Sequence, residues 1–330
     1  DNTTIVCNTP DLTSGPVNVS VTLNGVDYSE SGVVFTVDLL PRVSSVSPAI
    51  GTAAGGTVVT VVGAGFEDGA SLGCTFGEAV SPATFVSSTA VTCVAPEVDA
   101  DTSLPAQARV SLTNNALDFS TDPIDFTYAA DIALEAGTPS SGPATGGTLV
   151  TVFGTNFVTS ASFEAAVGGS PAASFRVVSD SELELTTPPG TVGTANVSVS
   201  LNGQEVVTLE SGFSYHADVE VTAVAPATGP SRGGTPVTIT GANFEYSAHL
   251  VCQFGLCAAV PGSFVNATTV QCETPAAVEA GDVDVTVSLN GADFSTSSAT
   301  FTFTALPHVA AVSPIAGSVT GGTVLNVTGS

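Results

Sequence analysis

The sequence has almost no cationic side chains. Its 330 residues contain four Lys or Arg against 30 Asp or Glu, so the formal net charge is −26 at pH 7. Nucleic-acid binding depends largely on clustered Lys and Arg that release counterions from phosphate, so we expect no nucleic-acid partner. Anionic membrane surfaces are disfavoured for the same reason. No apolar run approaches the ~18 to 20 residues that span a bilayer, so we expect no membrane insertion in this segment.

Helical patterns are also missing. Met and Trp are absent, and no long window places apolar side chains at helical spacing. Charged residues make up 10% of the chain and hydrophobic residues 43%, which is enough apolar surface for packed cores and argues against disorder. Val and Thr are abundant, and 34 Gly and 20 Pro interrupt the chain. We therefore expect an all-β protein made of short strands and tight turns.

A repeated tripeptide organises the sequence. Gly-Gly-Thr occurs four times, beginning at Gly55, Gly146, Gly233 and Gly321. These starting positions differ by 91, 87 and 88 residues, so the chain has a regular period. An X-Pro dipeptide precedes each copy, and an alternating run such as Val237–Thr240 follows it. Alternation with a period of two is typical of a half-buried strand.

A second strand in three of the periods ends at Asn-Gly. These strands are expected at Val17–Leu23, Val197–Leu201 and Val283–Leu289. Asn-Gly tolerates positive φ at both positions, so we predict a two-residue type I′ turn after each strand. In the first strand, alternation places Val19, Val21 and the other apolar residues on the face toward the core.

The motifs follow a fixed order within the period. Pro is followed by Gly-Gly-Thr, by strand-forming residues before Gly-x-x-Phe, by Cys-x-Phe-Gly at Cys74–Gly77, and by Val-x-Cys-x-x-Pro at Val91–Pro96. Along its whole length the chain resembles the IPT/TIG domain, an immunoglobulin-like fold shared by plexins, transcription factors and many extracellular proteins. The resemblance implies tandem immunoglobulin-like β-sandwiches (IPT/TIG-like) in a linear array, although fold does not by itself decide function.

The period divides the chain into three full repeats and two partial ones. The first full repeat spans residues 42–130, the second 131–217 and the third 218–306, while residues 1–41 match the second half of a repeat and 307–330 only its first strands. The missing initiator Met and signal peptide favour a segment of a longer array. Alternatively, the last strands of one chain complete the half-repeat of the next chain by strand donation, although a direct join would omit the equivalent of Ala242–Val265.

Four of the six cysteines occupy matching places in two repeats. Cys74 and Cys93 lie 19 residues apart in the first full repeat, and Cys252 and Cys272 lie 20 apart in the third. Matching placement predicts two intradomain disulfides, with buried reduced thiols as the alternative. A zinc site is disfavoured, because Cys-x-x-Cys and clustered His are missing. Disulfides imply an oxidising compartment, so we expect a secreted, extracellular or cell-surface protein.

The remaining cysteine positions break this pattern. The expected partner of Cys7 lies upstream of residue 1. Cys257 has no counterpart in the other repeats, so three possibilities stay open: competition with Cys252 for Cys272, pairing outside the chain, or a free thiol. In the second full repeat we assign Phe163 and Leu185 to the places of the cysteine pair, so apolar packing would have to close the gap there.

Five sequons agree with an extracellular location. The Asn-x-Ser/Thr motifs begin at Asn2, Asn18, Asn196, Asn266 and Asn326. Some would arise by chance in a chain this rich in Ser and Thr. However, Asn18 and Asn196 occupy equivalent outward positions on the same strand, so we expect glycans on at least two sequons if the source is eukaryotic.

Residues for catalysis or metal binding are sparse. His216, His249 and His308 have no local Ser, Cys or Asp arrangement typical of nucleophilic catalysis, and His216 and His308 lie at joints between repeats. Two acidic groups, Glu97 with Asp99 and Asp101 and Asp282 with Asp284, lack calcium-loop spacing and are interpreted as solvated surface. We expect no enzyme, no cofactor and no metal.

The joints indicate a mechanical role. Successive repeats follow one another with almost no linker, as at His216–Ala217 and at Leu306–Pro307, so the array should be semi-rigid. The sequence therefore predicts an extracellular structural or adhesive protein that forms a stalk or filament. Its partners would be further copies or a continuation of the array, together with glycans. A ligand-binding, receptor-like ectodomain and an accessory module of a secreted enzyme are the alternatives.

Overall fold

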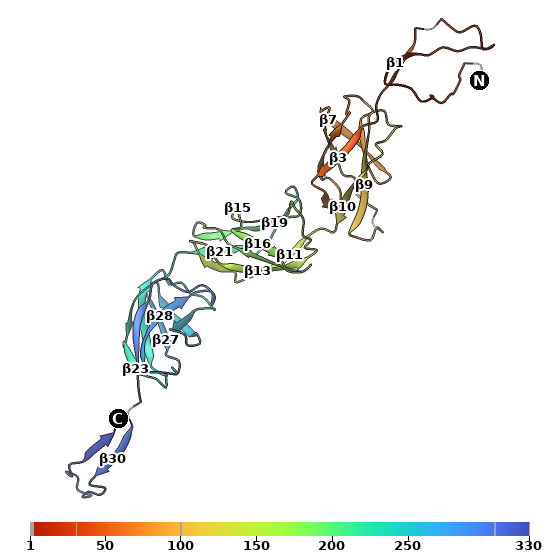
Figure 1. Cartoon of the computed structure of the whole chain (residues 1–330). Helices are drawn as coiled ribbons and strands as arrows, with labels where there is room; N and C mark the ends of the chain where they lie inside the picture. Colours follow the sequence, from red (N-terminus) through yellow and green to blue (C-terminus); the bar gives the residue numbers. More distant parts are fainter. Residues whose placement is uncertain (1–2, 31, 100, 307, 330) are drawn as a thin grey trace. The chain divides into compact units, whose positions relative to one another are not determined.

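The structure is a computed structural model that describes residues 3–30, 32–99, 101–306 and 308–329. The regular elements in these residues are β-strands, which confirms the all-β prediction (Figure 1). The chain divides into two compact units: the residues up to Asp131 together with Ser160–Ser162 form one, and the other residues from Ile132 onward form the second. None of the described residues form a helix with the length and hydropathy needed to cross a membrane.

The first full repeat is a sandwich in which one strand belongs to both layers. Its strands are β3 (Arg42–Ser47), β4 (Ile50–Thr52), β5 (Val58–Ala64), β6 (Gly73–Phe76), β7 (Ala79–Ser87), β8 (Ala90–Val94), β9 (Ala106–Thr113) and β10 (Ile124–Ala129). They are hydrogen-bonded in the order β3-β5-β8-β7-β6-β9-β10-β4. The beginning of β7 pairs with β6 and its end pairs with β8, so β7 passes from one layer to the other.

The third full repeat has the same strand order. Its strands are β22 (Glu220–Ala225), β23 (Thr228–Pro230), β24 (Pro236–Ala242), β25 (Val251–Phe254), β26 (Val260–Asn266), β27 (Thr269–Glu273), β28 (Gly281–Ser288) and β29 (Ala299–Thr304). Their order is β22-β24-β27-β26-β25-β28-β29-β23, with β26 in the position of β7. The pairings of the crossing strand with both layers are therefore reproduced two periods later, since β3 begins at Arg42 and β22 at Glu220, 178 residues further on.

The second full repeat divides the crossing strand in two. Its strands are β11 (Ala133–Thr138), β12 (Ser141–Pro143), β13 (Leu149–Thr155), β14 (Glu164–Val167), β15 (Ser170–Pro171), β16 (Ser174–Val177), β17 (Glu182–Thr186), β18 (Gly193–Ala195), β19 (Val197–Ser200), β20 (Val206–Thr208) and β21 (Phe213–His216). They form the sheets β11-β13-β17-β16, β12-β21-β18 and β15-β14-β19-β20. Here β15 and β16 replace the single crossing strand of the other repeats.

Each partial repeat contributes one two-stranded sheet. In the first, β1 (Gly15–Asn18) pairs with β2 (Val34–Val37), and in the last, β30 (Val309–Ser313) pairs with β31 (Asn326–Gly329). The predicted core face of the first partial repeat is not buried: Leu23 is 99% exposed, whereas its counterpart Leu289 in the third full repeat is 3% exposed. The alternation prediction is wrong there because no second sheet covers β1 and β2 within the described residues.

The sandwich cores consist of alternating Val and Leu residues closed by aromatic rings. In the first full repeat, Phe126 stands edge-on to Phe76, with ring centroids 5.3 Å apart, and to Tyr128 at 5.0 Å. In the third, Phe301 stands edge-on to Phe254 at 5.6 Å and to Phe303 at 5.0 Å. These perpendicular pairs are the favourable geometry for aromatic rings, and in each repeat they lie within one layer, on β6 and β10 in the first and on β25 and β29 in the third.

The Gly-Gly-Thr motif forms a tight turn at the entrance to a central strand. Gly146 and Gly147 have φ of +76° and +90°, a region that side chains other than glycine rarely adopt. The backbone of Gly147 donates to the carbonyl of Thr187, and Thr187 donates back to the carbonyl of Thr148, both at 2.9 Å. These two hydrogen bonds connect the Gly-Gly-Thr motif to Thr187, the residue that follows β17.

Burial of two tyrosines predicts a pH dependence. Tyr128 and Tyr215 are each 2% exposed. Burial raises the pKa of Tyr128 to about 12, and it raises the pKa of Tyr215 as well. Because the folded state favours the neutral phenols, their contribution to stability is present below the unfolded pKa of about 10 and is lost as the pH rises through the folded pKa. In a spectrophotometric titration, the folded chain should ionise part of its phenols at higher pH than the chain in denaturant. Superimposable curves would contradict this.

Candidate functional site

Four loops share one hydrogen-bonded turn, here named the Asn-x-x-Asp turn. The turns are Asn24–Asp27, Asn115–Asp118, Asn202–Glu205 and Asn290–Asp293. In each, the Asn Oδ1 accepts backbone N–H groups two and three residues later, as in Asn290 from Ala292 at 2.9 Å and from Asp293 at 2.8 Å. In the three turns that end in Asp, the Asn Nδ2 also donates to the Asp Oδ2, at 2.8, 2.9 and 2.6 Å.

This geometry corrects the predicted type I′ turns. A type I′ turn requires positive φ at both central residues. The positive φ values fall on Gly25, Gly203 and Gly291, and on Ala116 at 61°, but not on the preceding Asn residues. The Asn side chain folds back onto the backbone instead, an alternative that Asn offers because its amide can mimic a backbone group.

The Asn290–Asp293 turn of the third full repeat contacts the second full repeat. Asp293 Oδ2 accepts a hydrogen bond from Thr148 Oγ1 at 2.8 Å, and Asn290 Nδ2 donates to the backbone carbonyl of Ser141 at 2.7 Å. Thr148 is the threonine of the Gly-Gly-Thr motif, and Ser141 begins β12. Because both repeats belong to one compact unit, these bonds define a joint. The turn of one repeat is thus seated on the Gly-Gly-Thr element of the repeat before it.

A second set of bonds fixes the connecting residues. Asp218 Oδ1 accepts from the backbone N of Thr145 at 3.3 Å and from its Oγ1 at 3.1 Å. The carbonyl of Asp218 accepts from Asn243 Nδ2 at 2.8 Å. Asp218 therefore ties the connection to both repeats, since Thr145 precedes Gly146 and Asn243 follows β24.

The joint encloses a small cavity of about 260 Å³. Thr145, His216, Asp218 and Asp293 are among its lining residues. His216 is 6% exposed, and its Nδ1 donates to the carbonyl of Ala217 at 2.9 Å, because a carbonyl oxygen can only accept. His216 is therefore a joint residue, as the sequence predicts. The cavity combines carboxylates and hydroxyls, so the site is suited to holding two protein surfaces together through hydrogen bonds.

The other predicted histidines and carboxylates do not converge. His249 and His308 are exposed. Asp282 accepts from Thr302 at 2.6 Å and Asp284 from Ser298 at 3.0 Å, so neighbouring hydroxyls already occupy these carboxylates. The described residues include no group of three or more His, Cys, Asp or Glu placed to hold a metal ion. Glu97, Asp99 and Asp101 are likewise exposed side chains.

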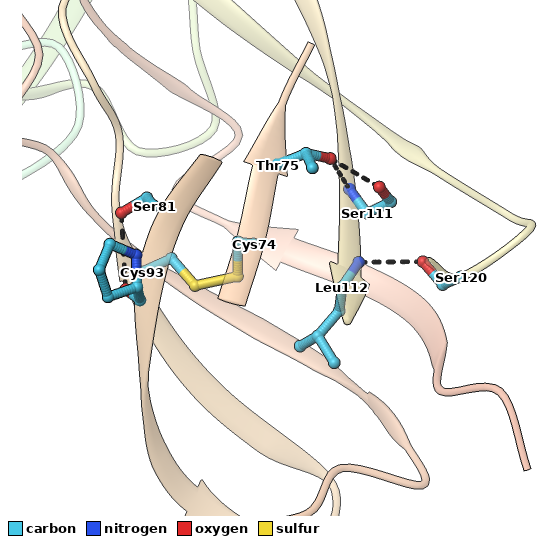
Figure 2. The surroundings of a disulfide bond; sticks show 8 residues. Cys74, Thr75, Ser81, Cys93, Ser111, Leu112 and Ser120 are labelled. Carbon is cyan, nitrogen blue, oxygen red and sulfur yellow. Dashed lines mark hydrogen bonds between the residues drawn. A yellow bond between two sulfur atoms is a disulfide. The ribbon is translucent and has the colours of Figure 1, made fainter. Parts of the chain in front are cut away.

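Two disulfides cross between the layers. Figure 2 shows Cys74 on β6 joined to Cys93 on β8, and Cys252 on β25 is joined to Cys272 on β27 in the same way. Their Cα atoms are 6.3 and 6.5 Å apart, within the usual range for a disulfide. Beside the first bridge, Thr75 Oγ1 and Ser111 Oγ lie 2.6 Å apart on neighbouring strands. Each bridge connects strands that pair with opposite ends of the crossing strand.

In the second full repeat, one of the two residues that replace the cysteine pair is not the one that the sequence predicted. Leu185 pairs with Val150, as Cys272 pairs with Val237, so its assignment is correct. The other position is Ala165, which pairs with Val199 as Cys252 pairs with Val287. Phe163 lies two residues earlier, where its ring centroid is 5.5 Å from that of Phe175. The sequence lacked the Cys-x-Phe-Gly signal here, so the alignment shifted by two residues.

The remaining candidates lie at the surface. Cys7 is exposed and Cys257 half-buried, and both are unbridged. Asn18, Asn196, Asn266 and Asn326 are exposed, while Asn2 lies outside the described residues. Asn266 Oδ1 accepts from Thr268 N and Oγ1, both at 2.9 Å.

The residues that make the joint were missed by sequence reasoning. Asp293 and Thr148 are 145 positions apart, and only the folded joint brings them together. A signal was nevertheless available, because Asn is followed three residues later by Asp or Glu in all four turns. The copy at Asn115 has Ala116 in place of Gly, so a search for Asn-Gly overlooked it.

The fold and the motifs define a class of protein, the tandem immunoglobulin-like β-sandwich. The IPT/TIG domain matches residues 1–37, 41–128, 135–215 and 220–303. The chain belongs to the IPT/TIG domain family, which confirms the resemblance seen in its motifs.

Relatives with this organisation are large. Fibrocystin-L of Mus musculus is 32% identical over 298 residues, which cover 88% of this chain and 7% of that protein. Plexin-2 of Caenorhabditis briggsae is 27% identical over 255 residues, covering 72% of this chain and 14% of that protein. Among solved structures, the full extracellular region of plexin A4 covers 90% of this chain and 28% of its own, with 19% identity and a TM-score of 0.43. The chain therefore spans a small part of each.

Proposed function

We propose that this chain is a non-catalytic part of an extracellular array of IPT/TIG domains, and that it serves as a semi-rigid structural or adhesive stalk or filament. The observation that carries the proposal is the joint between the second and third full repeats. The turn at Asn290–Asp293 is hydrogen-bonded to Thr148 and Ser141 of the other repeat. A joint of this kind resists bending between neighbouring domains, which a mechanical role requires.

Several features support an extracellular location. The two disulfides are typical of an oxidising compartment. The relatives include plexins, and the plexin A4 chain is described as an extracellular region. The four described sequons are exposed, which is the condition for carrying glycans. The net charge of −26 would keep such an array soluble through mutual repulsion.

The proposal includes the division of the chain. We assign residues 42–130, 131–217 and 218–306 to complete domains, and residues 1–41 and 307–330 to partial ones. The half-domains would be completed either along a longer chain or by strands of another copy. Self-association into a filament and continuation of a longer array remain the two proposed forms of assembly.

A distance measurement between two repeats tests the stalk proposal. Spin labels would be placed at Ser179 in the second full repeat and Glu279 in the third, both exposed, after Cys7 and Cys257 are replaced by Ser. Double electron–electron resonance should give one narrow distribution of distances between the two labels, because the joint holds the two repeats in one arrangement. A broad distribution, like that of domains on a flexible linker, would contradict a stiff joint.

A receptor-like ectodomain is the second candidate, and the similarity to plexins favours it. In that case the loops of the domains would bind a protein or glycan ligand. A saturable, one-to-one complex with a purified partner would favour the receptor, whereas regular polymers in electron micrographs of the native material would favour the filament.

A further inference from the structure

The first full repeat has an acidic pocket beside the end of β6 and the beginning of β9, here named the Tyr128 pocket. Its volume is about 330 Å³. Three carboxylates line it, those of Glu78, Glu97 and Asp99, and its described lining residues include no Arg, Lys or His. None of the three carboxylates forms an ion pair within the described residues. The pocket therefore concentrates unpaired negative charge.

A buried tyrosine hydroxyl opens into this pocket. Tyr128 is 2% exposed and is one of the lining residues. Its hydroxyl has no hydrogen-bond partner within the described residues, yet it is not among their polar atoms that are sealed from solvent. The hydroxyl is thus reached from the pocket. Because buried polar groups are nearly always hydrogen-bonded, an unpartnered hydroxyl on so buried a side chain points to a bound group.

The second full repeat shows how this tyrosine is satisfied elsewhere in the chain. Tyr215 occupies the same register position as Tyr128, and its hydroxyl donates to the carbonyl of Pro188 at 2.7 Å. The ring of Tyr215 lies so close to Gly190 that a side chain there would collide with it. Val98 holds the matching place in the first full repeat, two residues after the proline. Tyr128 therefore cannot pack in the same way, and its hydroxyl stays free.

The corresponding pocket of the second full repeat has no carboxylate, and the joint leaves it uncovered. It is lined by residues of that repeat alone and has a volume of about 320 Å³. The third full repeat is docked on the second through Asp293 and Thr148, yet it does not line this pocket. In the third full repeat Phe303 takes the position of the tyrosine. Among the full repeats, only the first combines carboxylates with a free hydroxyl.

We propose that the Tyr128 pocket binds an arginine side chain of a basic partner peptide. The guanidinium donates to the Tyr128 oxygen and to the surrounding carboxylates, while its aliphatic stem lies against the apolar lining, which includes Phe76 and Val98. Arginine suits the pocket better than lysine, because its planar group presents five donors and is more weakly hydrated. The described carboxylates are not placed to share a metal ion. The site is independent of the stalk proposal, since neither requires the other.

Titration of the 330-residue chain with the blocked peptide acetyl-Ala-Arg-Ala-amide tests the site. In proton–nitrogen NMR spectra, the amide signals of Gly77, Val98 and Gln107 should shift saturably, with a Kd on the order of 1 mM. The matching citrulline peptide keeps the shape but lacks the charge, and it should bind about tenfold more weakly or less well still. The lysine peptide should lie between the two. A citrulline or lysine peptide that binds as tightly as the arginine peptide would overturn the proposal.

Variants of the chain separate the pocket from general attraction to a negative protein. Tyr128→Phe and Glu97→Gln should each raise the Kd about fivefold or more. Tyr128→Phe should fold, since Phe303 already fills this position in the third full repeat. Two matched controls should leave the Kd unchanged: Tyr215→Phe removes a hydroxyl that is already bonded, and Glu210→Gln removes an exposed carboxylate of the second full repeat. Equal weakening by Glu97→Gln and Glu210→Gln, or no effect of Tyr128→Phe, would overturn the assignment.

Discussion

Reduction of the two disulfides should lower the free energy of unfolding of the first and third full repeats by about 3 kcal/mol each, and leave the second unchanged. Each bridge closes a loop, of 19 residues for Cys74–Cys93 and 20 for Cys252–Cys272. Cross-linking a loop of this size removes conformational entropy from the unfolded chain, which gives that magnitude. Breaking a bridge also leaves two thiols in a closely packed core.

Hydrogen exchange read by mass spectrometry can follow the three repeats in one sample. The second full repeat is the internal control, because Ala165 and Leu185 occupy the positions of the cysteine pair. After reduction and alkylation, or in Cys74→Ala/Cys93→Ala and Cys252→Ala/Cys272→Ala, core amides of the affected repeat should exchange roughly a hundredfold faster. Equal acceleration in all three repeats would show that the bridges do not act locally.

The sequence predicted the fold because the period and the alternation are local signals. Val285 and Val287 alternate with polar residues, and both are fully buried in the structure. The matched cysteines were assigned by their repeat positions, without reference to any three-dimensional distance. These features depend on which face of a strand a residue occupies, which a period of two reveals directly.

The contacts at the joint between the second and third full repeats could not be predicted from the repeat period or from the alternation of apolar and polar residues. Asp293 and Asn290 act through a turn whose conformation is set by the Asn side chain, and their partners Thr148 and Ser141 belong to another repeat. The threonine recurs in each Gly-Gly-Thr and the acidic residue in each Asn-x-x-Asp turn, but this recurrence does not show that the two segments meet across a joint. Similarly, Phe163 was assigned to the cysteine position because the Cys-x-Phe-Gly motif is missing in that repeat, and only the strand register identifies Ala165.

Removal of the Asp293 carboxylate should uncouple the second and third full repeats. Asp293→Ala removes the acceptor for Thr148 Oγ1 and for Asn290 Nδ2. Since Thr148 is fully buried, its hydroxyl would be left without a partner, at a cost of about 2 kcal/mol to the joint. We expect the narrow distance distribution between labels at Ser179 and Glu279 to broaden, and exchange to accelerate at the amide of Thr148.

A double-mutant cycle separates the contact from the internal stability of the turn. Thr148→Val and Asp293→Ala should show a coupling energy of about 1.5 to 3 kcal/mol, as expected of a hydrogen bond to a charged group. Asp118→Ala is the matched control: Asp118 accepts from Asn115 Nδ2 at 2.9 Å within its own turn, so its loss should loosen only that turn. Additive effects of Thr148→Val and Asp293→Ala would show that the bond between the repeats contributes nothing to the stiffness of the joint.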